Sequence, residues 1–187
     1  MHSARAKPIR GGYTVRREQA GQTDRSQNRK KNSPKTKPVN AFHDEKNNLK
    51  VFLYYFGKAR DQHANAIAAE FLKRSSRYAN CEMREIVFGR FDFFNKHPSA
   101  QKVFLDPAGK PFDSAAFTAL VQKAETEGRD VVFLVGGHDG LPAEWKPRAD
   151  LLLSLSPMTF PHELARAMLA EQIYRAFTTL RGHPYPR

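Results

Sequence analysis

One segment near the middle of the chain restricts the possible folds more than any other. Val131–Val135 is an uninterrupted run of apolar residues, and the glycine-rich sequence Gly136-Gly137-His138-Asp139-Gly140 follows it directly. An apolar run of this length, bounded by glycines, is typical of a strand in a parallel sheet, because such strands are covered on both faces. The segment therefore predicts an α/β fold with a mainly parallel sheet.

The chain from residue 49 onward alternates strand and helix patterns around this segment. Further strands are predicted at residues 49–56, 82–88, 102–105 and 150–155. Helices are predicted at residues 61–78, from Asp113 or Ser114 to Gly128, at 141–149 with a break near Pro147, and at 162–180. A turn at residues 106–109, which contain a proline and a glycine, is expected to close the strand at 102–105.

Residues 1–48 differ in composition from the remainder. They hold twelve Lys and Arg residues and four acidic residues, so they carry +8 of the chain's net charge of +12. Large apolar residues are too few there to form a core, and we expect a disordered basic extension before a single domain at 49–187. Such a charge favours attraction to nucleic acid. A leader without function, a transit peptide and an untranslated segment are the alternatives.

Several classes of protein are disfavoured by what the sequence lacks. No run of 18 or more apolar residues predicts a membrane span, and the amino-terminal region has no apolar centre like that of a secretory signal. The single cysteine, Cys81, excludes an intrachain disulfide framework, and a cytoplasmic location is the simplest expectation. The histidines have no metal-ligand spacing and G-x-S-x-G is absent, so neither a metal site nor a hydrolytic triad is predicted.

Two loops at the carboxyl ends of predicted strands are candidates for a ligand pocket. Glycines at 136, 137 and 140 would let backbone N–H groups approach a ligand, although the pattern is neither G-x-G-x-x-G nor a P-loop. The loop at 155–161, with sequence LSPMTFP, offers apolar side chains and hydroxyls, which suit a cofactor with an adenine ring and polar edges. Taken singly, the first loop is as readily a structural turn, and helix capping is the simpler interpretation of the second.

Four sequence blocks resemble the RlmH family. They are FLVGGHDGL at 133–141, LSLSPMTFPH at 153–162, EQIYRA at 171–176 and RGHPY at 181–185, and their order and spacing match across residues 49–187. The resemblance implies the SPOUT fold, an α/β domain whose carboxyl-terminal part forms a trefoil knot around an S-adenosylmethionine pocket, and a homodimer. The implied reaction is methylation of N3 of a pseudouridine in large-subunit (23S) ribosomal RNA, free or in an assembled ribosome.

The resemblance also implies a role for particular residues. The methyl-donor pocket would be lined by Leu105, Gly136, Leu155, Ser156, Pro157, Met158, Thr159 and Phe160. His183 would act as a base or hydrogen-bond acceptor in catalysis, and Tyr185 would orient or stack on the target base. The alternative for these last two residues is that they only dock the carboxyl-terminal segment.

Three arginines are expected on the RNA-binding surface, namely Arg166, Arg175 and Arg181. Phosphate contacts would be their function in that case. For Arg166 and Arg175 the alternative is an ion pair with Glu163 and Glu171, respectively, on the same helix.

Three features depart from the family pattern. Residues 1–48 precede the usual start near Leu49, the connection between Glu85 and Val103 is shorter than usual, and Pro186 follows Tyr185 where the family commonly has a histidine. They leave open a non-catalytic RNA-binding or ribosome-associated protein on the same scaffold. The enzyme is favoured, because a protein without catalysis need not keep both candidate loops.

The basic extension generates the first testable prediction. Deleting residues 1–48 should leave folding and cofactor affinity unchanged, while RNA affinity falls and its dependence on salt flattens, because fewer counterions are released. Circular dichroism, calorimetry and RNA titrations over a salt series provide the measurements. An unfolded truncation, or one with an unchanged salt slope, would contradict this picture.

Overall fold

The computed structural model of the protein describes residues 48–185, so the expected basic extension lies outside the described residues except for Asn48. The strands are β1 (Lys50–Tyr55), β2 (Asn80–Glu85), β3 (Gln101–Pro111), β4 (Val131–Val135) and β5 (Leu151–Ser154). The helices are α1 (Gln62–Ser75), α2 (Phe93–Lys96), α3 (Ser114–Glu127), the 3₁₀ turn η1 (Lys146–Arg148) and α4 (His162–Leu180).

The five strands form one parallel sheet in the order β2-β1-β4-β3-β5. β4 lies at its centre, and all five of its residues are buried, as its apolar sequence predicts. The expected α/β class is therefore confirmed. The trefoil knot stays a prediction from the resemblance.

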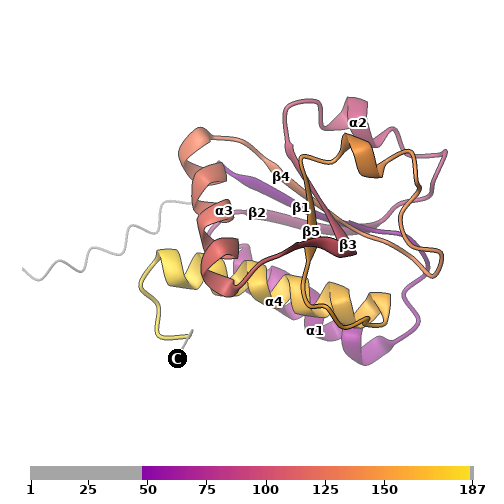
Figure 1. Cartoon of the computed structure of the whole chain (residues 1–187). Helices are drawn as coiled ribbons and strands as arrows, with labels where there is room; N and C mark the ends of the chain where they lie inside the picture. Colours follow the sequence, from indigo (N-terminus) through magenta and orange to yellow (C-terminus); the bar gives the residue numbers. More distant parts are fainter. Residues whose placement is uncertain (1–47, 186–187) are drawn as a thin grey trace, which may run out of the picture. The chain divides into compact units, whose positions relative to one another are not determined.

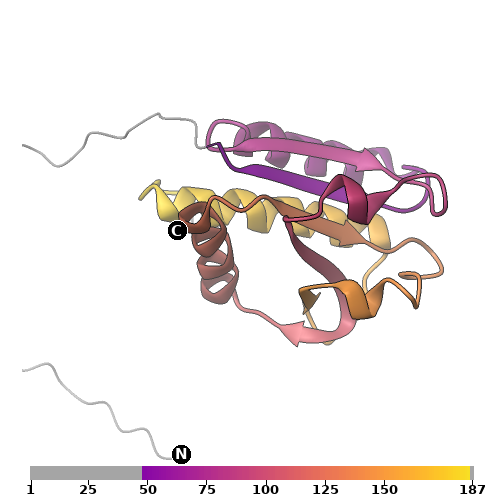
Figure 2. The same cartoon turned by 90° about the horizontal axis from the view of Figure 1, so that it is seen from above.

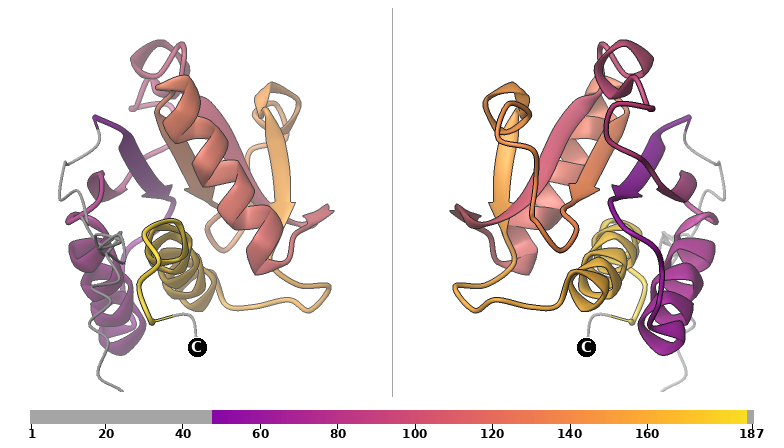
Figure 3. Two further views of the ribbon diagram at one scale, coloured as in Figure 1. Left: turned by 90° about the vertical axis from the view of Figure 1, so that its left-hand side faces the viewer. Right: turned by 90° about the vertical axis from the view of Figure 1, so that its right-hand side faces the viewer.

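The two faces of the sheet are covered differently (Figure 1). Helices α1, α3 and α4 pack on one face, where Val131, Phe133 and Val135 of β4 point, and α1 and α4 lie side by side there (Figure 3). The other face, which receives Val132 and Leu134, is covered by the short α2 and the segment around η1. No helix of the described residues is long and apolar enough to cross a membrane.

Helix boundaries follow local signals in the sequence. Asp61 caps α1 by accepting hydrogen bonds from two backbone N–H groups, and Asp113 caps α3 by accepting one from the backbone N–H of Ala116. Gly128 ends α3 in the left-handed conformation. These caps confirm the expected starts of α1 and α3 and the end of α3, and α4 matches its predicted range, whereas α1 ends at Ser75, before the predicted end at residue 78.

Two further expectations about the bounds of elements were wrong. β2 begins two residues and ends three residues before the predicted 82–88, because it pairs in register with β1 from Lys50 onward. The helix expected at 141–149 is only η1, since Pro147 lies within that turn. The pairing register of β2 depends on contacts with β1, which local sequence patterns do not encode.

The predicted turn at 106–109 is instead an irregularity within β3. The strand bends and continues to Pro111 (Figure 2). Its pairing with β5 shifts register between Leu105 and Lys110. Gly109 is required there, because a Cβ at this position would lie 2.6 Å from the carbonyl oxygen of Leu152. The glycine therefore marks close approach of two strands rather than the end of one.

The carboxylate of Glu163 joins the start of α4 to the start of α1. Its oxygens accept hydrogen bonds from the backbone N–H groups of Arg60 (2.7 Å) and Asp61 (3.0 Å). They also accept from Asn65 Nδ2 (2.9 Å) and Arg166 Nη2 (3.2 Å). The hydrogen bond from Asn65, followed by those from the two backbone N–H groups, lowers the pKa of Glu163 to about 2. The ionised carboxylate thus fastens two segments that follow different strands.

A charge-removing substitution tests this junction. At neutral pH, Glu163→Gln should lower the free energy of unfolding by about 2 kcal/mol, as expected for hydrogen bonds to a charged group. Because the folded pKa is depressed, the stabilisation is full above the ordinary pKa of 4.5 and is lost as the pH falls from there toward 2. Urea denaturation across this pH range should therefore show that the free energies of unfolding of the wild type and of Glu163→Gln become equal in acid. A difference in stability that does not depend on pH would contradict the assignment.

Candidate functional site

A cavity of about 510 Å³ opens at the carboxyl ends of β4 and β5, beside the irregularity of β3 that begins at Leu105. This volume lies in the range of small-molecule sites, and the position is where open parallel sheets bind ligands. The cavity is lined by residues 105–107, 135–138, 140, 141, 146, 153, 155, 156, 158–162 and 165. It therefore brings together the two loops that the sequence singles out.

The glycine loop after β4 is a tight turn closed on itself. Gly137 and Gly140 exchange backbone hydrogen bonds of 3.3 and 3.1 Å. A Cβ on Gly136 would lie 2.8 Å from the carbonyl carbon of Gly140, so no side chain fits at this position without moving the backbone. The loop thus presents main chain, rather than side chains, to the cavity.

The second loop contributes the opposite wall. The hydroxyl of Ser156 accepts a hydrogen bond from the backbone N–H of Met158 (3.0 Å), and the hydroxyl of Ser154 donates to the carbonyl of Ser156 (2.9 Å). These contacts hold the loop in one conformation, with the Met158 side chain 69% exposed at the rim. All predicted cofactor residues except Pro157 line the cavity. Their part in binding a cofactor stays a prediction.

An ion pair that sequence reasoning missed also lies in the wall. Asp106 accepts a 2.7 Å contact from Lys146 Nζ and a hydrogen bond from the Ala108 N–H. The hydrogen bond from Lys146 is the main reason that the pKa of Asp106 is lowered. Asp106 directly follows Leu105 at the start of the β3 irregularity, which sequence patterns predicted as a turn. The cavity therefore contains a carboxylate that stays ionised at neutral pH.

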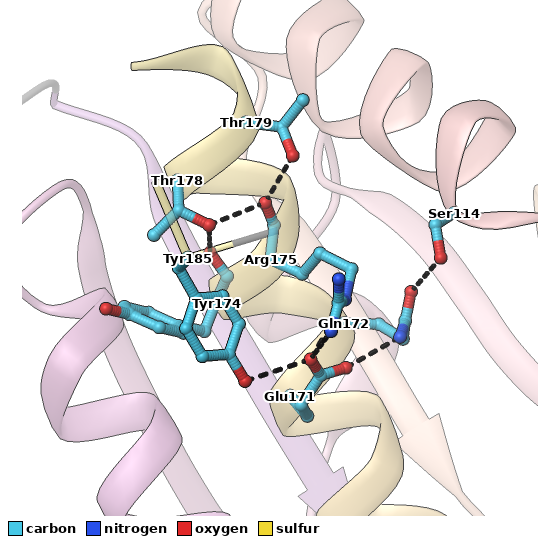
Figure 4. Close-up of polar contacts among 8 residues, drawn as sticks. All are labelled: Ser114, Glu171, Gln172, Tyr174, Arg175, Thr178, Thr179 and Tyr185. Carbon is cyan, nitrogen blue, oxygen red and sulfur yellow. Dashed lines mark hydrogen bonds and ion pairs between the residues drawn. The ribbon is translucent and has the colours of Figure 1, made fainter. Parts of the chain in front are cut away.

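A second cavity of about 420 Å³ lies between β5, the start of α3 and α4, and shares Leu153 and Leu155 with the first. Glu171 on its wall organises a polar network (Figure 4). Its carboxylate accepts two hydrogen bonds from Arg175, at 2.9 and 2.7 Å, and one from Gln172 at 2.6 Å. Within one chain, Arg175 therefore forms an ion pair with Glu171, which is the alternative that the sequence analysis gave for this arginine.

The carboxyl-terminal segment reaches this same network. The hydroxyl of Tyr185 donates to Glu171 (3.1 Å), and its ring packs edge-on against Tyr174 with centroids 4.7 Å apart. Burial, then the hydrogen bond to Glu171, raises the pKa of the Tyr185 hydroxyl. His183 Nδ1 accepts from the backbone N–H of Tyr185 (3.1 Å). In a single chain, neither His183 nor Tyr185 lines the first cavity.

The three arginines predicted to contact RNA differ in exposure. Arg166 is only 1% exposed, with its guanidinium 3.7 Å from the centre of the Tyr55 ring and paired with Glu163. Its burial lowers the pKa of the guanidinium and leaves it no open path to a phosphate, so this placement does not suit the predicted contact. Arg181 pairs with Glu125 at 2.8 Å and is partly exposed. An RNA contact by Arg175 or Arg181 stays a prediction.

These features define a class: an α/β protein with a parallel sheet and a cofactor-sized cavity at the carboxyl ends of its strands. The family model described as "Predicted SPOUT methyltransferase" matches residues 49–186. The chain therefore belongs to the SPOUT methyltransferase family and is an enzyme of that family.

Curated relatives agree with this assignment. "Ribosomal RNA large subunit methyltransferase H" of Solibacter usitatus is 68% identical over 139 residues, which cover 74% of this chain and 100% of the relative. The protein of the same name from Sorangium cellulosum is 42% identical over 143 residues, covering 73% and 99%. Among solved structures, a probable methyltransferase from Bordetella pertussis matches with a TM-score of 0.47 at 12% identity, covering 72% of this chain and 99% of that one.

The two neighbouring glycines give a matched test of the loop. Gly136→Ala should lower the free energy of unfolding by about 1–3 kcal/mol, because the new Cβ meets backbone that must move. Gly137→Ala should cost less, because its Cβ would lie 3.2 Å from Phe56 Cβ and 3.3 Å from the Phe56 carbonyl oxygen, a looser approach than the 2.8 Å at Gly136. Urea denaturation of both variants makes the comparison. Equal losses in the free energy of unfolding for the two variants would show that the close approach of Gly136 to Gly140 does not constrain the loop.

Proposed function

We propose that the protein transfers a methyl group from S-adenosylmethionine to N3 of a pseudouridine in large-subunit ribosomal RNA. The observation that carries this proposal is the convergence of the glycine loop and the 155–160 loop on one cavity of about 510 Å³. The names of the relatives support ribosomal RNA as the substrate. Methylation of ribosomal RNA would take place in the cytoplasm.

The residues present fit this cofactor. Backbone groups of the glycine loop can approach polar edges, and Leu105, Leu155 and Met158 provide apolar surface for an adenine ring. Asp106 and Lys146 form an ion pair in the cavity wall, so together they offer polar atoms rather than net charge to the polar edges of a ligand. Among the described residues, no group of three or more His, Cys, Asp or Glu side chains could hold a metal ion.

When bound, S-adenosylmethionine supplies a methyl group on a sulfonium sulfur. The chain must orient the target base for in-line attack, keep water out and accept the N3 proton. Glu171 already accepts hydrogen bonds from Arg175, Gln172 and Tyr185, so its carboxylate holds these groups in place. We therefore assign proton acceptance to His183, and positioning of the base to Tyr185 and Arg175, which Glu171 orients.

The same geometry supports a homodimer. In one chain the Glu171 network lies outside the first cavity, although Leu153 and Leu155 belong to the linings of both cavities. A two-fold pairing would bring the network of one chain to the cofactor cavity of its partner. The exposed Leu164 on α4 and Ile67 on α1 provide apolar surface for such a pairing.

Cofactor binding has a direct test. Thr159→Trp places a large ring at the rim of the cavity, and its affinity for S-adenosylmethionine should fall about tenfold or more, a change of about 1.4 kcal/mol or more. Isothermal calorimetry measures this, with Thr126→Trp on the exposed side of α3 as the control. A folded wild-type protein that binds no S-adenosylmethionine would favour the non-catalytic RNA-binding alternative. Mass spectrometry of ribosomal RNA from a strain that lacks the gene identifies the methylated base.

Mixed dimers test the shared site. A Thr159→Trp chain and a Glu171→Gln chain should each be inactive alone, while a random mixture should recover about a quarter of wild-type activity, because half of the dimers contain one intact composite site. Methyl transfer to ribosomal RNA is the readout, and sedimentation reports the dimer. No recovery from well-folded mixed dimers would place the complete site within one chain.

A further inference from the structure

The sheet face opposite α1 and α4 carries an aromatic layer whose edge is exposed. Its buried members come from β1, β3, β4, α2 and the segment before η1, namely Tyr54, Phe93, Phe104 and Trp145 with their aliphatic neighbours. Val87 and Phe88, in the connection from β2 to α2, are 48% and 50% exposed. Exposed apolar side chains that adjoin each other suggest a contact surface rather than scattered surface residues.

Phe88 lies next to the wall of the first cavity. Its ring packs against that of the buried Trp145, with centroids 5.7 Å apart and an interplanar angle of 53°. Trp145 immediately precedes Lys146, and Lys146 and Leu141 both line the cavity. A ligand group in contact with Phe88 would thus lie close to a second ligand bound in the first cavity.

Positive charge accompanies the aromatic rings. The guanidinium carbon of Arg148 lies 3.3 Å from the centre of the Phe94 ring, and Lys96 Nζ lies 5.2 Å from that of Phe91. Arg90, two residues after Phe88, is exposed. In the part of the chain that the structure describes, Arg90, Lys96 and Arg148 form no ion pair. Their charges are therefore available to a partner.

We propose that Phe88 is a stacking platform for an unpaired base of the RNA substrate, flanking the target base, and that Arg90 and Arg148 bind the adjoining phosphates. This proposal rests on the proposed function for the identity of the substrate. Exposed aromatic rings interleaved with unpaired cations suit single-stranded RNA, whose bases stack and whose phosphates attract arginine. A protein partner would favour a larger apolar patch with less unpaired charge.

The stacking contact is tested by fluorescence anisotropy with a short unstructured RNA oligonucleotide of mixed sequence and the full chain. Phe88→Ala should weaken RNA binding about fivefold or more, since a base stacked on an aromatic ring contributes at least that much. Gln122→Ala, an exposed residue on α3 that lines neither cavity, is the control and should change little. Equal affinity of the two variants would overturn the platform.

The phosphate contact has its own readout. Arg90→Gln should flatten the slope of log affinity against log salt by about 0.7, the value for one lost phosphate contact on a single strand. Lys73→Gln removes an exposed charge from α1 on the opposite face and should leave the slope near that of the wild type. Identical slopes for the two variants would overturn the assignment to Arg90.

Two further measurements separate this proposal from the function on which it rests. Calorimetry with S-adenosylmethionine should give wild-type affinity for Phe88→Ala, because Phe88 does not line the cavity. If no variant or wild-type protein binds S-adenosylmethionine while Phe88→Ala still loses RNA affinity, methyl transfer fails and the platform stands. If Phe88→Ala instead disrupts the dimer in sedimentation without a loss of RNA affinity, the surface is a protein interface and the platform is wrong.

Discussion

Parallel pairing of β4 with β1 on one side and β3 on the other is the constraint on which the rest of the structure depends. Both faces of β4 are buried, so each face must be covered, and all strands must end at the same edge. The cavity forms at that edge because the backbone turns sharply after β4. The absence of a side chain at Gly136 allows the turn to close against Gly140.

The unequal cover of the two faces gives the molecule two kinds of surface. Three helices cover one face and leave exposed apolar residues on α1 and α4, where we propose that a second subunit pairs. A short aromatic segment covers the other and leaves Phe88 exposed beside unpaired cations. Dimer formation and RNA binding can therefore use opposite faces, with the cavity at the edge between them.

Two half-buried carboxylates lie at the ends of the first half of α4. Glu163 holds its start to α1, while Glu171 gathers Arg175, Gln172 and Tyr185 near its middle. The first carboxylate stabilises the fold, and the second holds the side chains that we propose to position the substrate. Residues of one type on one helix thus serve different purposes because their partners differ, and helical spacing alone does not distinguish them.

Sequence alone determined the α/β class, the central buried strand, the capped ends of α3 and the two loops that line the cavity. These features depend on local patterns: apolar runs, Asp113 at a helix start, Gly128 at a helix end and glycines after a strand. Family resemblance, rather than pattern, supplied the methyltransferase activity. Only the tertiary structure decided the register of β2, the continuation of β3 through residues 106–111 and the burial of Arg166. Each of these depends on contacts between segments far apart in the chain, such as Gly109 against Leu152 or Arg166 against Tyr55, which no local pattern encodes.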